Sequence, residues 1–104
     1  MTDAIARFTQ LLEKHPDNEL ARFSLGKAYF DLQQFAPAKA QLEQALARKP
    51  DWMIVQILVG KCELALGHRA PALTAFQRAR QLAIEQDHEG PLAEVDQLLA
   101  DLQS

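Results

Sequence analysis

Residues 16–50 read PDNELARFSLGKAYFDLQQFAPAKAQLEQALARKP, and the landmarks of this stretch return 34 positions later. The pairs at this offset include Gly26-Lys27 with Gly60-Lys61 and Ala36-Pro37-Ala38 with Ala70-Pro71-Ala72. A fixed period in this range is typical of helical repeats, in which one helix pair must stack on a neighbour to bury its apolar face. The repeat therefore predicts an extended helical surface and not a catalytic pocket.

Periodicity and helix-breaking residues predict about six helices. Pro16, Pro50 and Gly90-Pro91 interrupt the chain, Pro37 and Pro71 suit the first turn of a helix, and Gly67 suits a left-handed helix end. The predicted helices run over 3–14, 18–32, 52–66, 69–87 and 90–103, and the third of the six has Pro37 in its first turn and ends before Pro50. Because every linker is short, consecutive helices are expected to pack antiparallel.

The second and third helices carry a motif of small and large residues at fixed spacing. It consists of Leu25-Gly26, Tyr29, Ala38, Leu42, Ala45 and Pro50. This segment resembles the tetratricopeptide repeat, which has Trp, Leu-Gly, Tyr, Ala, Phe and Pro at these spacings. Arg22 stands here in place of the Trp and Leu42 in place of the Phe. The next copy keeps Gly60, Ala72, Phe76 and Ala79 but has Glu63 in place of Tyr and Ile84 in place of the closing Pro.

The resemblance implies an all-α fold, a right-handed superhelical stack of antiparallel helix pairs. Residues 1–104 are expected to form a single domain of this kind. Its predicted parts are a half repeat at 3–17, which matches the motif through Ala4, Phe8 and Pro16, full repeats at 18–52 and 53–86, and a capping helix at 90–103. The last helix has its leucines on one stripe and acidic residues opposite, as suits a helix that covers the end of a stack.

A second apolar stripe recurs in register on the helices at 18–32 and 52–66, beyond the stripe that packs against neighbours. In the family, this face lines a concave groove that receives a peptide or a helix. By resemblance, the predicted partner-binding residues are Leu20, Phe23, Lys27, Phe30, Ile54, Ile57, Lys61 and Leu64, with Trp52 flanking them. The alternative is that these residues are core, covered by neighbouring helices or by the acidic C-terminal segment.

Lys27 and Lys61 suggest two uses for this face. They could hold an acidic residue or a chain-terminal carboxylate of a partner, or simply extend to water along their apolar stems. The family's clamp for an acidic C-terminus also needs Asn residues, and neither helix has one beside its Lys. Hydrophobic contacts with a partner are therefore favoured over carboxylate recognition.

Charge is distributed unevenly along the chain. Residues 1–80 hold all 11 Lys and Arg against eight acids, a net charge of +3, whereas residues 81–104 hold six acids and no base. The acidic end is either a solvated helix face, a site for a basic partner, or a segment that folds onto the basic body. With so small a basic excess and no basic stripe interleaved with aromatics, no nucleic-acid binding is expected.

Composition excludes several other classes. A single cysteine, Cys62, excludes an internal disulfide, and the sequence has neither a secretory signal nor an apolar run long enough for a membrane span. A cytoplasmic protein without cofactor or metal is expected, because the three His and Cys62 lack ligand spacing and no Gly-rich phosphate loop occurs. The predicted function is a non-enzymatic protein-interaction module that binds a protein or peptide partner. The alternative is a module that forms homo-oligomers through the same apolar surface.

Overall fold

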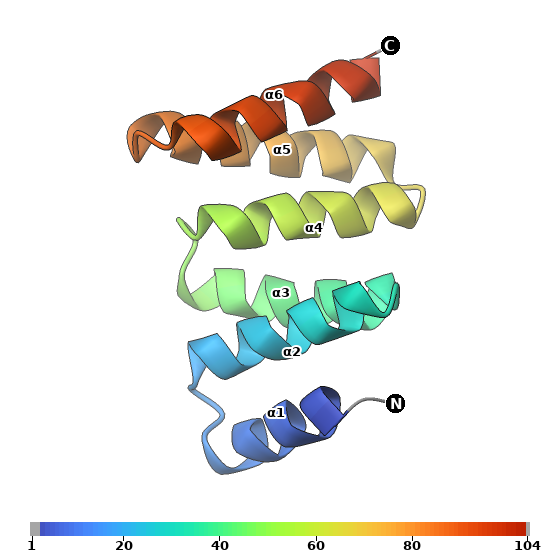
Figure 1. Ribbon diagram of the computed structural model, residues 1–104, viewed down its shortest axis with the longest axis vertical. Helices are drawn as coiled ribbons and strands as arrows, with labels where there is room; N and C mark the ends of the chain where they lie inside the picture. The colour runs from blue at the N-terminus through green and yellow to red at the C-terminus, as the bar shows by residue number, and fades with distance from the viewer. Residues whose placement is uncertain (1–2, 104) are drawn as a thin grey trace. The chain divides into compact units, whose positions relative to one another are not determined.

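The computed structural model describes residues 3–103 and consists there of helices, with no strand (Figure 1). The helices are α1 (Asp3–Lys14), α2 (Glu19–Asp31), α3 (Phe35–Arg48), α4 (Met53–Ala65), α5 (Arg69–Glu85) and α6 (Glu89–Gln103). The prediction of an all-α chain with six helices is confirmed. Helix ends differ from the predicted ones by one or two residues at most places, and Pro37 and Pro71 lie in the first turns of α3 and α5.

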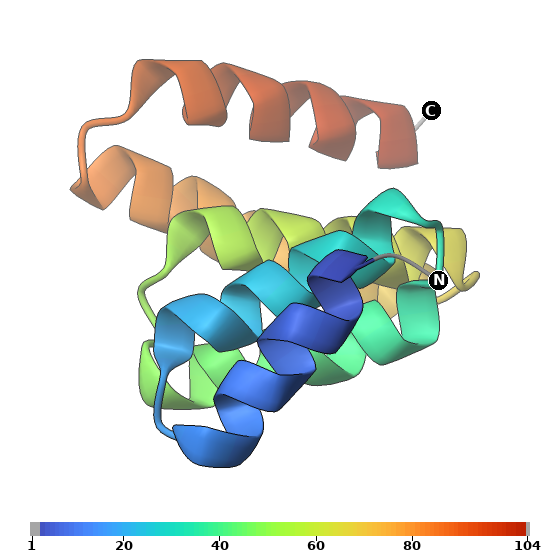
Figure 2. The same cartoon turned by 60° about the horizontal axis from the view of Figure 1, so that its bottom comes forward.

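The chain divides into two compact units at Pro50 and Asp51, close to the predicted repeat boundary at residues 52 and 53. Unit 1 contains α1, α2 and α3, and unit 2 contains α4, α5 and α6. In unit 1, α2 packs against both α1 and α3, and in unit 2, α5 packs against both α4 and α6. Successive helices within each unit run in opposite directions (Figures 1 and 2).

Each unit contains one helix pair in which a glycine faces a large apolar side chain. We call α2 and α4 front helices, and α3 and α5 back helices. A Cβ atom added at Gly26 of α2 would lie 2.8 Å from Leu42 Cδ2 of α3. A Cβ added at Gly60 of α4 would lie 2.7 Å from Phe76 Cδ1 of α5. Glycine therefore lets each front helix approach its back helix closely, as the repeat motif predicts.

The same turn ends α2, α4 and α5. Its residue with positive φ is Gln33 (61°), Gly67 (83°) and Asp87 (58°). The next residue in each turn donates its backbone N–H to the carbonyl oxygen five positions earlier, at 2.8–3.0 Å. This is the Schellman pattern, which satisfies carbonyl groups that the helix end would leave unpaired. The left-handed helix end predicted at Gly67 is confirmed.

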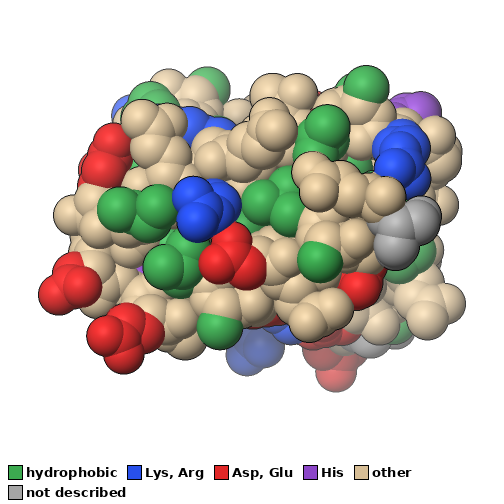
Figure 3. Space-filling view, turned by 90° about the horizontal axis from the view of Figure 1, so that it is seen from above, with side chains coloured by type: hydrophobic (Ala, Val, Ile, Leu, Met, Phe, Trp, Pro, Cys, Tyr) green, Lys and Arg blue, Asp and Glu red, His purple; other side chains and the backbone are tan. Residues whose placement is uncertain are grey.

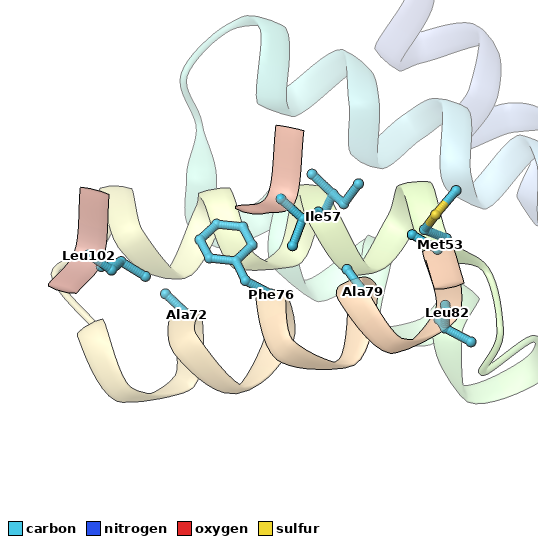
Figure 4. Close-up of a cluster of buried hydrophobic side chains, with 9 residues drawn as sticks. Met53, Ile57, Ala72, Phe76, Ala79, Leu82 and Leu102 are labelled. Carbon is cyan, nitrogen blue, oxygen red and sulfur yellow. The ribbon is translucent and has the colours of Figure 1, made fainter. Parts of the chain in front are cut away.

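Each unit has its own apolar core. In unit 1, buried Ile5 and Leu12 of α1 meet Ala21 and Leu25 of α2. In unit 2, side chains from all three helices meet around Phe76 (Figure 4). The buried members of that cluster are Met53, Ile57, Ala72, Phe76, Ala79, Leu82, Ala83, Val95 and Leu102. The predicted capping helix thus contributes Val95 and Leu102 directly to the core of unit 2.

The close contact at Gly60 predicts that a methyl group is not tolerated there. We expect Gly60→Ala to lower the free energy of unfolding by about 1–3 kcal/mol, because Phe76 must move away from the new Cβ. Thermal or urea unfolding measures this change. Gly90→Ala is the matched control, because a Cβ at Gly90 meets nothing within 4 Å. Equal losses in both variants would show that the Phe76 contact does not decide the effect.

The turn after α2 predicts a stabilising substitution. Gln33 holds a positive φ that glycine adopts without steric cost, so Gln33→Gly is expected to raise the free energy of unfolding by about 0.5–1 kcal/mol. Gln44→Gly, at an exposed interior position of α3, should have the opposite sign, because glycine inside a helix lowers helix stability. A loss of stability in Gln33→Gly would contradict the role of this turn.

Candidate interaction surface

The predicted residues of unit 1 form one face of α2. This α2 face consists of Leu20, Phe23, Lys27 and Phe30, which recur every three or four residues and therefore lie along one side of the helix. Leu20 is 68% exposed, the largest exposed fraction among the exposed large hydrophobic residues. Phe23 and Phe30 are half-buried. The Phe30 ring meets the Phe35 ring at the start of α3 edge to face, with 5.6 Å between the centroids.

Lys27 contributes a charge to the α2 face, and a residue of its own helix neutralises it. Its Nζ lies 2.7 Å from Asp31 Oδ1, one turn further along α2. Both side chains are well exposed, and such pairs contribute only a few tenths of a kcal/mol. The α2 face therefore presents apolar side chains with a weakly held ion pair among them.

The corresponding face of α4, which consists of Ile54, Ile57, Lys61 and Leu64, has a different environment. Ile54 and Leu64 are exposed. Ile57 is only 5% exposed and belongs to the apolar core of unit 2 together with Val95 and Leu102 of α6 (Figure 4). With α6 in this position Ile57 does not offer its side chain to a partner, and its role in partner binding stays a prediction. The alternative stated from the sequence, burial under the acidic C-terminal segment, applies at this position.

Helix α6 is attached to unit 2 along both edges of its apolar stripe. On one edge, Lys61 Nζ of α4 lies 2.8 Å from Glu94 Oε2. On the other, Arg80 Nε of α5 donates to Asp96 Oδ1 at 2.7 Å. Between these two edges lie the buried Val95 and Leu102. The acidic segment thus folds onto basic residues of its own unit, and Lys61 is engaged in doing so.

Trp52 and Glu63 occupy special positions at the two ends of α4. Trp52 is half-buried and is the residue that precedes the first turn of the helix. Glu63 is buried, and its Oε1 lies 2.9 Å from His68 Nδ1 in the turn that leads to α5. The sequence marks Glu63 only as a departure from the Tyr of the motif, and it gives no sign of this contact with His68.

Within residues 3–103, no three His, Cys, Asp or Glu side chains are grouped as metal ligands would be. Cys62, the sole cysteine of the sequence, is buried. None of the described helices is long and apolar enough to cross a membrane. What the geometry offers is an apolar surface on α2, with Ile54 and Leu64 exposed on α4.

Comparison with known proteins places these features in a family. The family model described as tetratricopeptide repeat matches residues 1–62. The TPR repeat-containing protein PA0015 of Pseudomonas aeruginosa is 33% identical over 69 residues, which are 66% of this chain and 66% of that protein. The match therefore spans slightly less than two thirds of this relative.

Solved structures share the fold. Protein BPP2914 from Bordetella parapertussis is 29% identical, with a TM-score of 0.87 over 99% of this chain and 90% of its own. The TPR2B domain of yeast Sti1, solved in complex with pHsp70, is 21% identical, with a TM-score of 0.85 over 95% of this chain and 79% of its own. The latter similarity shows the fold alone.

The two kinds of contact that hold α6 predict different costs when they are removed. Val95→Ala is expected to lower the free energy of unfolding by about 2 kcal/mol, because a fully buried side chain leaves a cavity. Lys61→Gln, which removes the partly exposed ion pair with Glu94, should cost less than about 1 kcal/mol. Urea unfolding of both variants measures the difference. A larger loss in Lys61→Gln would mean that charge, and not apolar packing, attaches α6.

Proposed function

Because the chain belongs to the tetratricopeptide repeat family, we propose that it is a non-enzymatic protein-interaction module whose α2 face binds a partner segment. Domains of this family generally mediate protein–protein interaction. The observation that carries the proposal is the exposure of Leu20, at 68%, on the same face as the half-buried Phe23 and Phe30. Large apolar side chains gathered at a surface are characteristic of interfaces.

The chemistry of the α2 face favours an apolar partner segment. Two aromatic rings and a leucine can receive the side chains on one face of a helix or an extended peptide. A partner carboxylate at Lys27 would have to compete with Asp31, and one at Lys61 would have to compete with Glu94. Hydrophobic contact is therefore expected to supply most of the affinity, and charge to adjust it.

On α4, the exposed residues of the predicted site remain candidates for partner binding. Ile54 and Leu64 are the exposed hydrophobic positions there, and Trp52 lies at the helix entrance. Ile57 and Lys61 contribute to partner binding only where α6 leaves its position. Membership of the tetratricopeptide repeat family supports a protein or peptide as the class of partner.

The second candidate function is self-association through the same apolar residues. The exposed Leu20 also favours self-association, because two copies could bury their apolar α2 faces against each other. Leu20→Glu should then turn a dimer into a monomer in light scattering. A wild-type chain that stays monomeric at all concentrations would eliminate this candidate and leave the peptide proposal.

Selection of peptides from a random display library tests the proposal without a known partner. Peptides enriched on the wild-type protein should carry apolar residues at helical or alternating spacing. Leu20→Glu is expected to weaken their binding at least tenfold, because a charge then lies at the centre of the contact. Ile84→Glu is the matched control, since Ile84 of α5 is also a large exposed hydrophobic residue, 52% exposed, and lies off the α2 face.

Two results would contradict the proposal. One is that the selected peptides bind Leu20→Glu as tightly as they bind the wild type. The other is that Ile84→Glu weakens binding by the same factor, which would indicate a general effect of surface charge. Circular dichroism of both variants confirms that their helices remain folded.

A further inference from the structure

Helix α1 carries three apolar residues at repeat positions that the back helices α3 and α5 bury completely. Ala4, Phe8 and Leu11 stand 34 positions before Ala38, Leu42 and Ala45, and 68 before Ala72, Phe76 and Ala79. All six later residues are 0% exposed, each in a helix paired with a front helix of its own unit. Ala4, Phe8 and Leu11 are only half-buried, and Phe8 and Leu11 pack on one side against the core of unit 1. We call these three residues the α1 end face.

Basic groups border the α1 end face. The guanidinium carbon of Arg7 lies over the Phe8 ring, 5.4 Å from its centroid. The surface is hollowed beside Leu11, and the hollow is lined by Arg7, Gln10, Leu11 and Lys14. Asp3, in the first turn of α1, is the acid on this side of the helix. The α1 end face thus combines an apolar strip, a hollow and two positive charges.

Helix α6 has the complementary properties on the side away from its core. Its outer face consists of exposed residues and includes no base of α6 itself: Glu89, Ala93, Asp96, Ala100 and Gln103. Asp96 lies at the edge of this face and is paired with Arg80 of α5. On the face that Figure 3 turns to the viewer, which lies on the α6 side of Figure 1, acidic side chains stand among hydrophobic and basic ones. The outer face of α6 carries the small residues Ala93 and Ala100. They permit a close approach of a second helix, as Gly26 and Gly60 do on the front helices.

From these complementary faces we infer that the α1 end face docks on the outer face of α6 of a second copy of this chain. In this contact, α6 occupies the position of a front helix, and α1 occupies the position of a back helix. Phe8 and Leu11 meet Ala93 and Ala100, while Arg7 and Lys14 approach Glu89 and compete with Arg80 for Asp96. Opposite charges select this orientation, and apolar burial holds it.

The contact joins two different surfaces, so each copy keeps one surface free for another copy. Such heterologous association does not stop at a dimer unless a ring closes. It also leaves the α2 face outside the contact. Self-association of this kind is therefore independent of partner binding at Leu20 and distinct from dimerisation through the α2 face.

Sedimentation velocity measures the association directly. A single helix-on-helix contact is small, so the protein is examined from about 10 µM to about 1 mM. We expect the mean mass to rise past that of a dimer. Raising the ionic strength to about 0.5 M should weaken the association roughly tenfold, because the charges at the rim are then screened.

Substitutions locate the contact. Ala100→Arg should reduce association at least tenfold by placing a long side chain on the α6 outer face, while Ala40→Arg, at an exposed position of α3, should leave it unchanged. Arg7→Glu should also reduce it. Adding Glu89→Arg to Arg7→Glu should restore it, because the charges are then exchanged between the two faces. Leu20→Glu should have no effect on it.

Three results would overturn the inference. They are a monomer over the whole concentration range, a mass that stops at the dimer, and equal losses in Ala100→Arg and Ala40→Arg. None of them bears on the peptide selection with Leu20→Glu, so failure here and failure of the proposed function remain distinguishable. Thermal melts of each variant show whether a loss of association reflects a loss of folding.

Discussion

The missing side chains at Gly26 and Gly60 set the distance between the helices of each unit, and other features depend on that distance. With a Cβ at Gly60, the ring of Phe76 could not lie where it does. Phe76 in turn is the centre of the core that includes Ile57, Val95 and Leu102. The close contact thus fixes which side of each front helix is buried. The adjoining edge of α2 carries the exposed Leu20 together with the half-buried Phe23 and Phe30.

The sequence predicts those parts of the fold that depend on local chemistry. Prolines mark helix starts at α3 and α5, Gly67 marks a helix end, and the spacing of small residues identifies the paired helices. The turns at Gln33 and Asp87 have no such signal, because residues other than glycine seldom adopt positive φ. Their conformation follows from the helices on either side and not from their own composition.

The site is less predictable than the fold, for a physical reason that Ile57 illustrates. The 34-residue period treats Phe23 and Ile57 as equivalent, yet Ile57 lies in a core that α6 completes, whereas Phe23 is half-buried in unit 1. The contact between Lys61 and Glu94 joins residues 33 positions apart and depends on how α6 packs. Periodicity identifies faces, but packing of a helix such as α6, which lies outside the two aligned copies, decides which of them stay exposed. The same apolar stripe is therefore a surface on α2 and partly a core on α4.

The helix arrangement also has a consequence for the speed of folding. Within each unit, the main contacts join helices that follow one another in the chain, and each connecting turn spans only a few residues. Little loop-closure entropy is lost before a contact forms, so contact order is low and folding is expected to be fast. Any helix pair can serve as the nucleus, α2 with α3 or α4 with α5, and neighbouring helices then add to it. A chain built this way spends little time with its apolar stripes exposed, which limits aggregation during synthesis.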